Sequence, residues 1–84
     1  MPIGVRDIKG KVIVDAIAQL PERFQTKDVS EMPMVIEAHG DLAEEYMWHA
    51  VMGRYISMNK KALGVQSQGK GAGGRGEIWQ KVGA

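Results

Sequence analysis

The sequence contains no cysteine, which excludes a disulfide framework and fits a reducing compartment. It also has no run approaching the roughly 20 apolar residues that a membrane-spanning helix needs. Its first residues include Arg6, Asp7 and Lys9 and lack the apolar segment of a signal peptide. We therefore expect a cytoplasmic protein that is neither exported nor inserted into a membrane.

Catalytic and metal-binding side chains are also scarce. His39 and His49 are the only histidines, and they form no cluster with carboxylates that has the spacing of a metal site or a nucleophile–base pair. Capping of a helix start explains the closely spaced Asp41, Glu44 and Glu45 better than acid–base chemistry does. We expect no catalysis, no metal and no cofactor, and we expect His39 to lie at the surface near a helix end.

The overall composition is typical of a small soluble globular domain. Hydrophobic residues make up 44% of the chain and charged residues 25%, which excludes a disordered tail and a collagen-like repeat. Two separate cores would leave too few of the 84 residues for each. We therefore expect a single domain over residues 1–84.

Charge is distributed unevenly along the chain. Residues 1–53 carry five basic and nine acidic side chains, a net charge of −4. Residues 54–84 carry six basic side chains and one acidic side chain, a net charge of +5. This asymmetry indicates a surface for a polyanion, built mainly from the C-terminal part of the chain. The alternative is a chance segregation of charge, which small domains often show.

Hydrophobic periodicity predicts two helices in the first half of the chain. Apolar residues at three- and four-residue spacing predict an amphipathic helix over residues 7–20, which begins nearer Gly10 if that glycine weakens the first turn. A second helix is expected over residues 27–38, with the Thr26 hydroxyl accepting a backbone N–H at its start. Pro33 either ends this second helix near Met32 or kinks it.

A third helix is predicted over residues 42–58, capped by Asp41 after a boundary at Gly40 and stopped by Asn59. One broad side of this helix is apolar and is expected in the core: Met47, Trp48, Val51, Met52, Tyr55 and Met58. Leu42 and Ile56 fall between the two sides and are expected to be partly buried. The other side is expected to be exposed: Tyr46, His49, Ala50, Gly53, Arg54 and Ser57.

The period changes after residue 61. Residues 62–68 and 77–82 predict two strands around a glycine-rich loop, and together they form a hairpin over residues 62–82. An isolated hairpin is only marginally stable in water. We therefore expect it to pack on the helices through Leu63, Val65 and one face of the last strand, with Trp79 closing the contact.

The order of these elements resembles a known family. A helix is followed by Phe24-Gln25-Thr26-Lys27-Asp28-Val29, a second helix, a longer third helix and a terminal hairpin with a basic glycine loop. Over residues 8–82 this order resembles the winged helix-turn-helix family of DNA-binding domains, and it implies an α+β fold of three helices with a C-terminal β-hairpin, the wing. In that family the third helix enters the major groove, and the wing reaches phosphates or the adjacent minor groove.

The resemblance also implies which residues contact DNA. On the third helix these are Tyr46, His49, Ala50, Gly53, Arg54 and Ser57, and at the tip of the wing they are Lys70 and Arg75. Lys60 and Lys61 follow the third helix and either contact the flanking phosphates or complement the helix dipole.

Two functions are compatible with these observations. The first is binding of double-stranded DNA, as a small transcriptional regulator or an accessory DNA-binding protein, either alone or as a homodimer. The second is a protein-interaction module, an inhibitor or adaptor that turns its acidic N-terminal half toward a basic protein partner.

Overall fold

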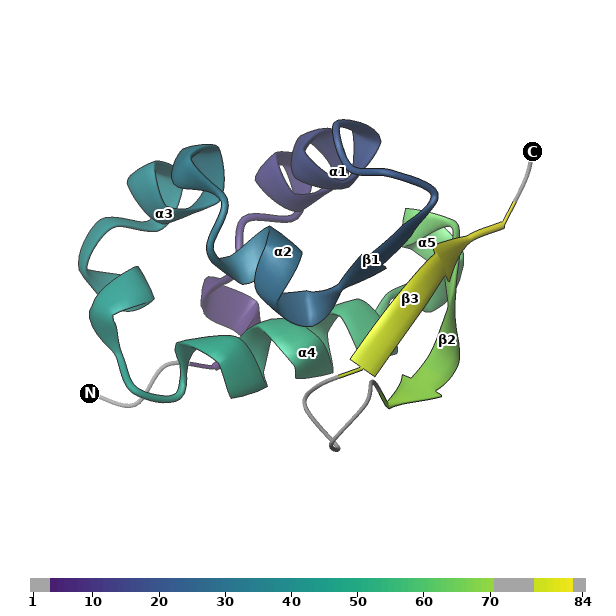
Figure 1. The fold of residues 1–84 in the computed structure, drawn as a ribbon. Helices are drawn as coiled ribbons and strands as arrows, with labels where there is room; N and C mark the ends of the chain where they lie inside the picture. Colours follow the sequence, from purple (N-terminus) through teal and green to yellow (C-terminus); the bar gives the residue numbers. More distant parts are fainter. Residues whose placement is uncertain (1–3, 71–76, 83–84) are drawn as a thin grey trace.

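A computed structural model describes residues 4–70 and 77–82 (Figure 1). The fold is α+β: three main helices, of which α4 is the longest, precede a C-terminal hairpin that belongs to a three-stranded antiparallel sheet. The helical elements are η1 (Val5–Asp7), α1 (Gly10–Ala18), α2 (Thr26–Ser30), α3 (Pro33–His39), η2 (Gly40–Glu44), α4 (Trp48–Met58) and α5 (Lys60–Leu63). The strands are β1 (Arg23–Gln25), β2 (Val65–Lys70) and β3 (Glu77–Lys81), in the order β1-β3-β2.

The short helix α2 connects the helical part of the fold. It contacts α4 on one side and α1 and α3 on the other, so that α4 lies opposite the α1–α3 pair (Figure 1). The buried apolar residues of these helices and of the sheet form one hydrophobic cluster. Within the described residues, no helix has the length and apolar character needed to cross a membrane.

The first helix is shorter than residues 7–20. It begins at Gly10, the alternative start, and ends at Ala18. A side chain at position 10 would meet α4, because an ideal Cβ there would lie 2.6 Å from the Tyr55 hydroxyl oxygen. Glycine at this position therefore allows the start of α1 to approach α4 closely.

Of the two alternatives at Pro33, the ending near Met32 is confirmed and a kinked helix continuing over residues 27–38 is wrong, because α2 ends at Ser30 and the separate helix α3 begins at Pro33. Met32 has an extended backbone, as a residue before proline prefers, and Pro33 opens α3 at a position where its missing N–H costs nothing. Capping by Thr26 is also wrong. Asp28 accepts the backbone N–H of Gln25 (2.8 Å), and the Thr26 hydroxyl is an acceptor for Trp79 instead.

The start of the third helix is also wrong, although its end is confirmed. Gly40 ends α3 with φ +57°, as its boundary role required, but Asp41 lies in the first turn of the 3-10 helix η2 instead of capping a long helix. The α-helix α4 begins only at Trp48 and ends at Met58, where the Asn59 side chain donates to the Tyr55 carbonyl (2.8 Å).

The pattern of burial along α4 agrees only in part with the expected pattern. Trp48, Val51 and Met52 are buried as expected, and Ile56 is completely buried rather than partly so. Met47 (40% exposed) and Met58 (66%) lie outside the core, contrary to expectation. The reason is that the core meets α4 along the row of Trp48, Met52 and Ile56, and both methionines fall at the edge of that row.

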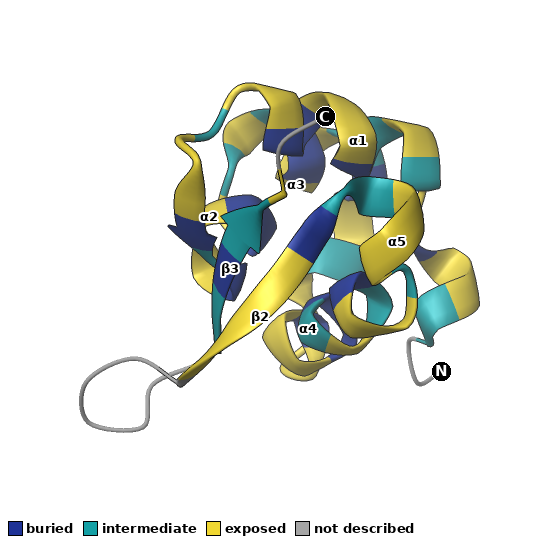
Figure 2. Cartoon of the chain, turned by 90° about the vertical axis from the view of Figure 1, so that its right-hand side faces the viewer, coloured by how far each residue is buried: buried dark blue, intermediate teal, exposed yellow. Residues whose placement is uncertain are grey.

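The hairpin differs from its expected form in two respects. Lys60–Leu63 forms the helical turn α5, which Gly64 ends in the left-handed conformation (φ +68°), so β2 starts at Val65 rather than at residue 62. The strand β1 was not expected; it pairs with β3 and places Phe24 opposite Trp79. As expected, Val65 and Trp79 are buried and attach the hairpin to the helices, whereas most of β2 is exposed (Figure 2).

Candidate nucleic-acid interface

The exposed face of α4 is the candidate interface. His49, Ala50, Arg54 and Ser57 are exposed on it, as the periodicity predicted, and Tyr46 lies 93% exposed in the turn that precedes the helix. Ala50 and Ser57 have small side chains, so the helix surface between them projects little into solvent. Arg54 is the long side chain on this face. A helix face of this kind allows its backbone to come close to base edges.

Gly53 differs from the other predicted contacts because it is half-buried. A Cβ built at Gly53 would lie 3.6 Å from the Thr26 methyl carbon. The small residue therefore faces α2, where an added Cβ would make an ordinary van der Waals contact, so the packing of α4 on α2 allows alanine here as well as glycine.

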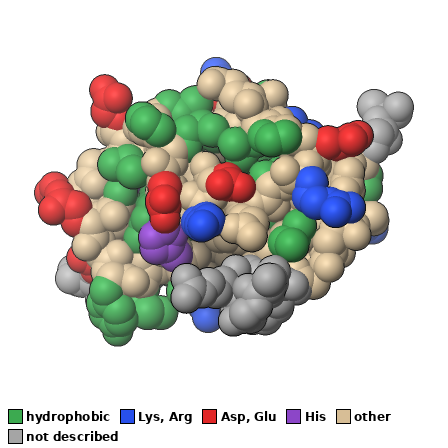
Figure 3. Space-filling view, viewed as in Figure 1, with side chains coloured by type: hydrophobic (Ala, Val, Ile, Leu, Met, Phe, Trp, Pro, Cys, Tyr) green, Lys and Arg blue, Asp and Glu red, His purple; other side chains and the backbone are tan. Residues whose placement is uncertain are grey.

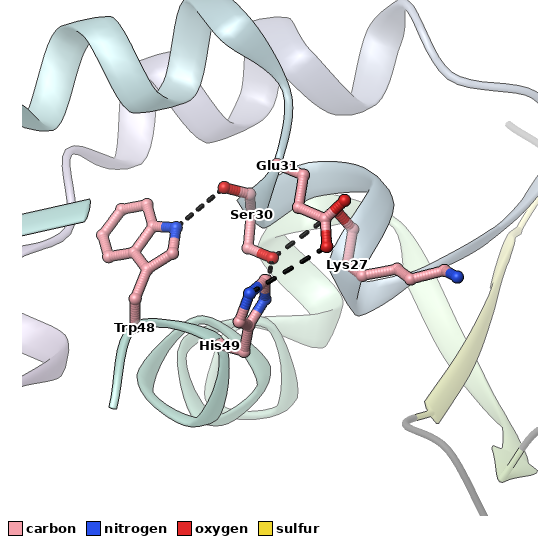
Figure 4. Close-up of polar contacts among 5 residues, drawn as sticks. All are labelled: Lys27, Ser30, Glu31, Trp48 and His49. Carbon is pink, nitrogen blue, oxygen red and sulfur yellow. Dashed lines mark hydrogen bonds and ion pairs between the residues drawn. The ribbon is translucent and has the colours of Figure 1, made fainter. Parts of the chain in front are cut away.

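The His49 side chain is held by α2 (Figure 4). Its Nδ1 is hydrogen-bonded to the Ser30 hydroxyl (2.5 Å), and its Nε2 lies 4.0 Å from a carboxylate oxygen of Glu31. The Ser30 hydroxyl also lies 3.5 Å from the Lys27 carbonyl, and the Ser30 carbonyl accepts the Trp48 indole N–H (2.7 Å). These contacts fix the start of α4 on α2 and leave the Nε2 edge of His49 near the surface.

The grouping of a serine, a histidine and a glutamate resembles a catalytic triad in its residue types alone. The Ser30 hydroxyl belongs to a completely buried residue and so cannot reach a substrate carbonyl. The cluster orients His49. Thr26 and Ser30 are four residues apart on α2, so their spacing could have indicated that both face the same neighbour, but nothing in the sequence indicated which neighbour.

Two of the four predicted basic contacts outside α4 lie directly after its C-terminal end. Lys60 and Lys61 are exposed on α5, directly after α4. Lys70 is the last residue of β2 and pairs with Glu77 across an irregularity in the hairpin, where Gly69 has φ +90°. Arg75 lies outside the described residues.

The beginning of α4 has the opposite charge. Glu44 and Glu45 are exposed just before it, and Glu31 of α2 is exposed beside His49. Figure 3 shows acidic side chains on the left and centre of this face, near a histidine, and hydrophobic side chains at the lower left, where α4 begins. The two ends of α4 therefore lie in surroundings of opposite charge.

His39 is not at the surface, contrary to expectation. It is 5% exposed, its Nε2 accepts the Lys9 backbone N–H (2.9 Å), and its Nδ1 donates to the Val35 carbonyl (2.8 Å). Its ring lies 5.0 Å from that of Trp48. Both nitrogens are used inside the fold, so His39 joins α1, α3 and α4 and takes no part in the candidate interface.

In the part of the chain that the structure describes, no three His, Asp or Glu side chains come together as a metal site. Comparisons of the chain with protein families, curated proteins and solved structures gave no match.

Proposed function

We propose that this chain is a winged-helix domain that binds double-stranded DNA, with the exposed face of α4 in the major groove and the β2–β3 hairpin on the backbone or in the minor groove. The proposal gives it the role of a cytoplasmic transcriptional regulator or accessory DNA-binding protein, with no catalytic step. The order of helix, strand, helices and hairpin, with β1 paired to β3, supports this scaffold.

One observation carries the proposed partner. No Asp or Glu occurs between Glu45 and Glu77, a stretch that includes all of α4, α5 and β2. The same stretch carries the cations Arg54, Lys60, Lys61, Lys70 and Arg75. Binding to DNA depends on cations that neutralise phosphates, and a carboxylate on the contacting surface would oppose it.

The chemistry of α4 suits both kinds of DNA contact. The Arg54 guanidinium can donate two hydrogen bonds to guanine O6 and N7, and the Ala50 methyl group can contact a thymine methyl. Lys60 and Lys61 act as phosphate contacts without sequence preference. The carboxylates near the start of α4 repel phosphate, so the proposal assigns the phosphate contacts to the C-terminal half of α4, α5 and the hairpin.

Fluorescence anisotropy of a labelled duplex, titrated across a salt series from low ionic strength, tests this function. We expect affinity that falls steeply with salt, and a lower salt slope for the double variant Lys60→Ala/Lys61→Ala. Lys11→Ala is the matched control, because Lys11 is an exposed cation of α1, a helix that the proposal leaves out of the DNA interface. Absence of binding to duplex DNA even at low ionic strength would refute the proposal.

A second candidate is supported by the acidic surroundings of the α4 start. Glu31, Glu44 and Glu45 are exposed there with the protruding Tyr46, an arrangement that suits a basic protein better than a nucleic acid. The chain would then be an inhibitor or adaptor. A pull-down from nuclease-treated lysate distinguishes the two, because a protein partner survives nuclease and a DNA-bridged partner is lost.

A further inference from the structure

Each end of α4 exposes apolar side chains that the core does not use. Tyr46 (93% exposed) and Met47 (40%) protrude at the start, and Met58 (66%) protrudes at the end. Met47 and Met58 are about three helical turns apart and therefore lie on the same side of the helix. Large exposed apolar side chains grouped with charges are typical of interaction surfaces.

The charges beside these apolar side chains are complementary. Glu44 and Glu45 directly precede Tyr46 and Met47. At the other end, Arg54 lies one turn before Met58, and Lys60 and Lys61 follow it. We name the first group, Glu44–Met47, the acidic end and the second group, Arg54, Met58, Lys60 and Lys61, the basic end.

We propose that the acidic end of one copy of this chain binds the basic end of a second copy. The contact joins Tyr46 and Met47 to Met58, and Glu44 and Glu45 to Lys60 and Lys61. Tyrosine, methionine and arginine are enriched in the centres of protein interfaces, and an Arg54 guanidinium over the Tyr46 ring adds a cation–π contact.

Charge complementarity indicates that each end binds the opposite end of another copy of this chain. Each copy carries one acidic and one basic end, and its total charge of +1 gives little repulsion between copies. Such a contact uses two different surfaces. It is made twice in a closed two-fold dimer if the two α4 helices lie antiparallel, and otherwise it leaves one unused end on each partner and extends into head-to-tail chains. The proposal does not depend on DNA binding.

Sedimentation velocity over a concentration series, at low ionic strength and without nucleic acid, tests the contact. We expect reversible association that weakens as salt is added. The acidic-end variant Glu44→Lys/Glu45→Lys and the basic-end variant Lys60→Glu/Lys61→Glu should each raise the apparent Kd by about tenfold or more. An equimolar mixture of the two variants should associate again, because the intact acidic end of one meets the intact basic end of the other.

Controls on α1 separate this contact from association through another exposed surface. Lys11→Glu and Asp15→Lys change exposed charges on α1, which contributes to neither end, and Val14→Ala removes an apolar side chain of similar exposure (50%) to Met47. We expect these three variants to associate as the parent does and Tyr46→Ala to associate less. The proposal is overturned if the parent stays monomeric, if the mixed variants remain apart, or if Val14→Ala rather than Tyr46→Ala weakens association. Since no DNA is present, these outcomes are independent of the proposed DNA binding.

Discussion

The indole N–H of Trp79 donates to the hydroxyl of Thr26 (2.9 Å), and these two residues are 53 positions apart in the chain. Trp79 is completely buried in β3, and Thr26 is the first residue of α2. Gly53 of α4 packs on the same threonine. A single side chain therefore connects the hairpin to the helix on which α4 rests, and it fixes the two parts of the proposed DNA-binding surface relative to each other.

This relationship predicts a difference between two substitutions of Thr26. Thr26→Val keeps the shape but leaves the buried indole N–H without an acceptor, and it should lower the free energy of unfolding by about 1–3 kcal/mol. Thr26→Ser keeps the hydroxyl and should cost less. Urea denaturation followed by tryptophan fluorescence measures both. Equal stability of the valine and serine variants would show that the hydrogen bond contributes nothing.

A second prediction concerns the contact between Gly10 and Tyr55. Alanine normally stabilises a helix relative to glycine, but a Cβ at position 10 would lie 2.6 Å from the Tyr55 hydroxyl oxygen. Gly10→Ala should therefore destabilise the fold, and the cost should be smaller in a Tyr55→Phe background, which removes that oxygen. A double-mutant cycle by thermal or urea unfolding gives the coupling. Additive effects of the two changes would contradict the close contact.

Residues with strong conformational preferences, together with hydrophobic periodicity, predicted much of this fold. Gly40 and Asn59 correctly mark the ends of α3 and α4, and the burial of Trp48, Val51 and Met52 follows from the period of α4. Burial departs from that expectation at Met47 and Met58, which are exposed, at Tyr55, which is half-buried, and at Ile56, which is completely buried. The strand β1 was not predictable, because it has three residues and exists through pairing with β3, with Arg23 opposite Gln80. Pairing between residues so far apart leaves no local pattern.

The candidate site was predictable to a similar extent. Periodicity identified the exposed side of α4, including Arg54 and Ser57. The Ser30–His49 bond and the packing of Gly53 on Thr26 depend on how α2 crosses α4, which no local pattern encodes. The start of α4 was missed because the spacing of Asp41 and Glu44 matches a capping pattern, although both residues lie inside the 3-10 helix η2 and η2 has no side-chain capping hydrogen bond.

The buried position of His39 gives a third prediction. His39→Ala removes the acceptor of the Lys9 N–H and the ring packed against Trp48, so it should lower the free energy of unfolding by about 2–4 kcal/mol. The substitution Glu37→Ala, at an exposed position of the same helix, is the matched control and should have little effect. Both are measured by urea denaturation. A His39→Ala variant as stable as the control would contradict the structural role.

Substitutions of Gly53 test whether this residue serves the packing of α4 on α2 or contact with the DNA groove. A Cβ at position 53 would lie 3.6 Å from the Thr26 methyl carbon, an ordinary van der Waals distance. Gly53→Ala should therefore leave the free energy of unfolding unchanged or raise it by up to about 1 kcal/mol, because alanine has the higher helix propensity. Gly53→Leu would push α4 from α2 and should cost about 1–3 kcal/mol. Thermal unfolding measures both. If Gly53→Leu is tolerated in stability but abolishes duplex binding, the glycine serves the groove and not the packing.

The last prediction separates the two proposed parts of the DNA interface. Lys70→Ala and Arg75→Ala should weaken binding to all duplexes alike and lower the salt slope by about one unit each, because a cation at a phosphate releases counterions without reading bases. Arg54→Ala should cost about 1–3 kcal/mol on the preferred sequence and less on others, because a base contact is lost. Anisotropy titrations on a selected and a random duplex measure both effects, with Lys11→Ala as control. If the two hairpin variants keep the parent's affinity at every salt concentration, the hairpin does not contact DNA, and α4 with α5 must account for all of the binding.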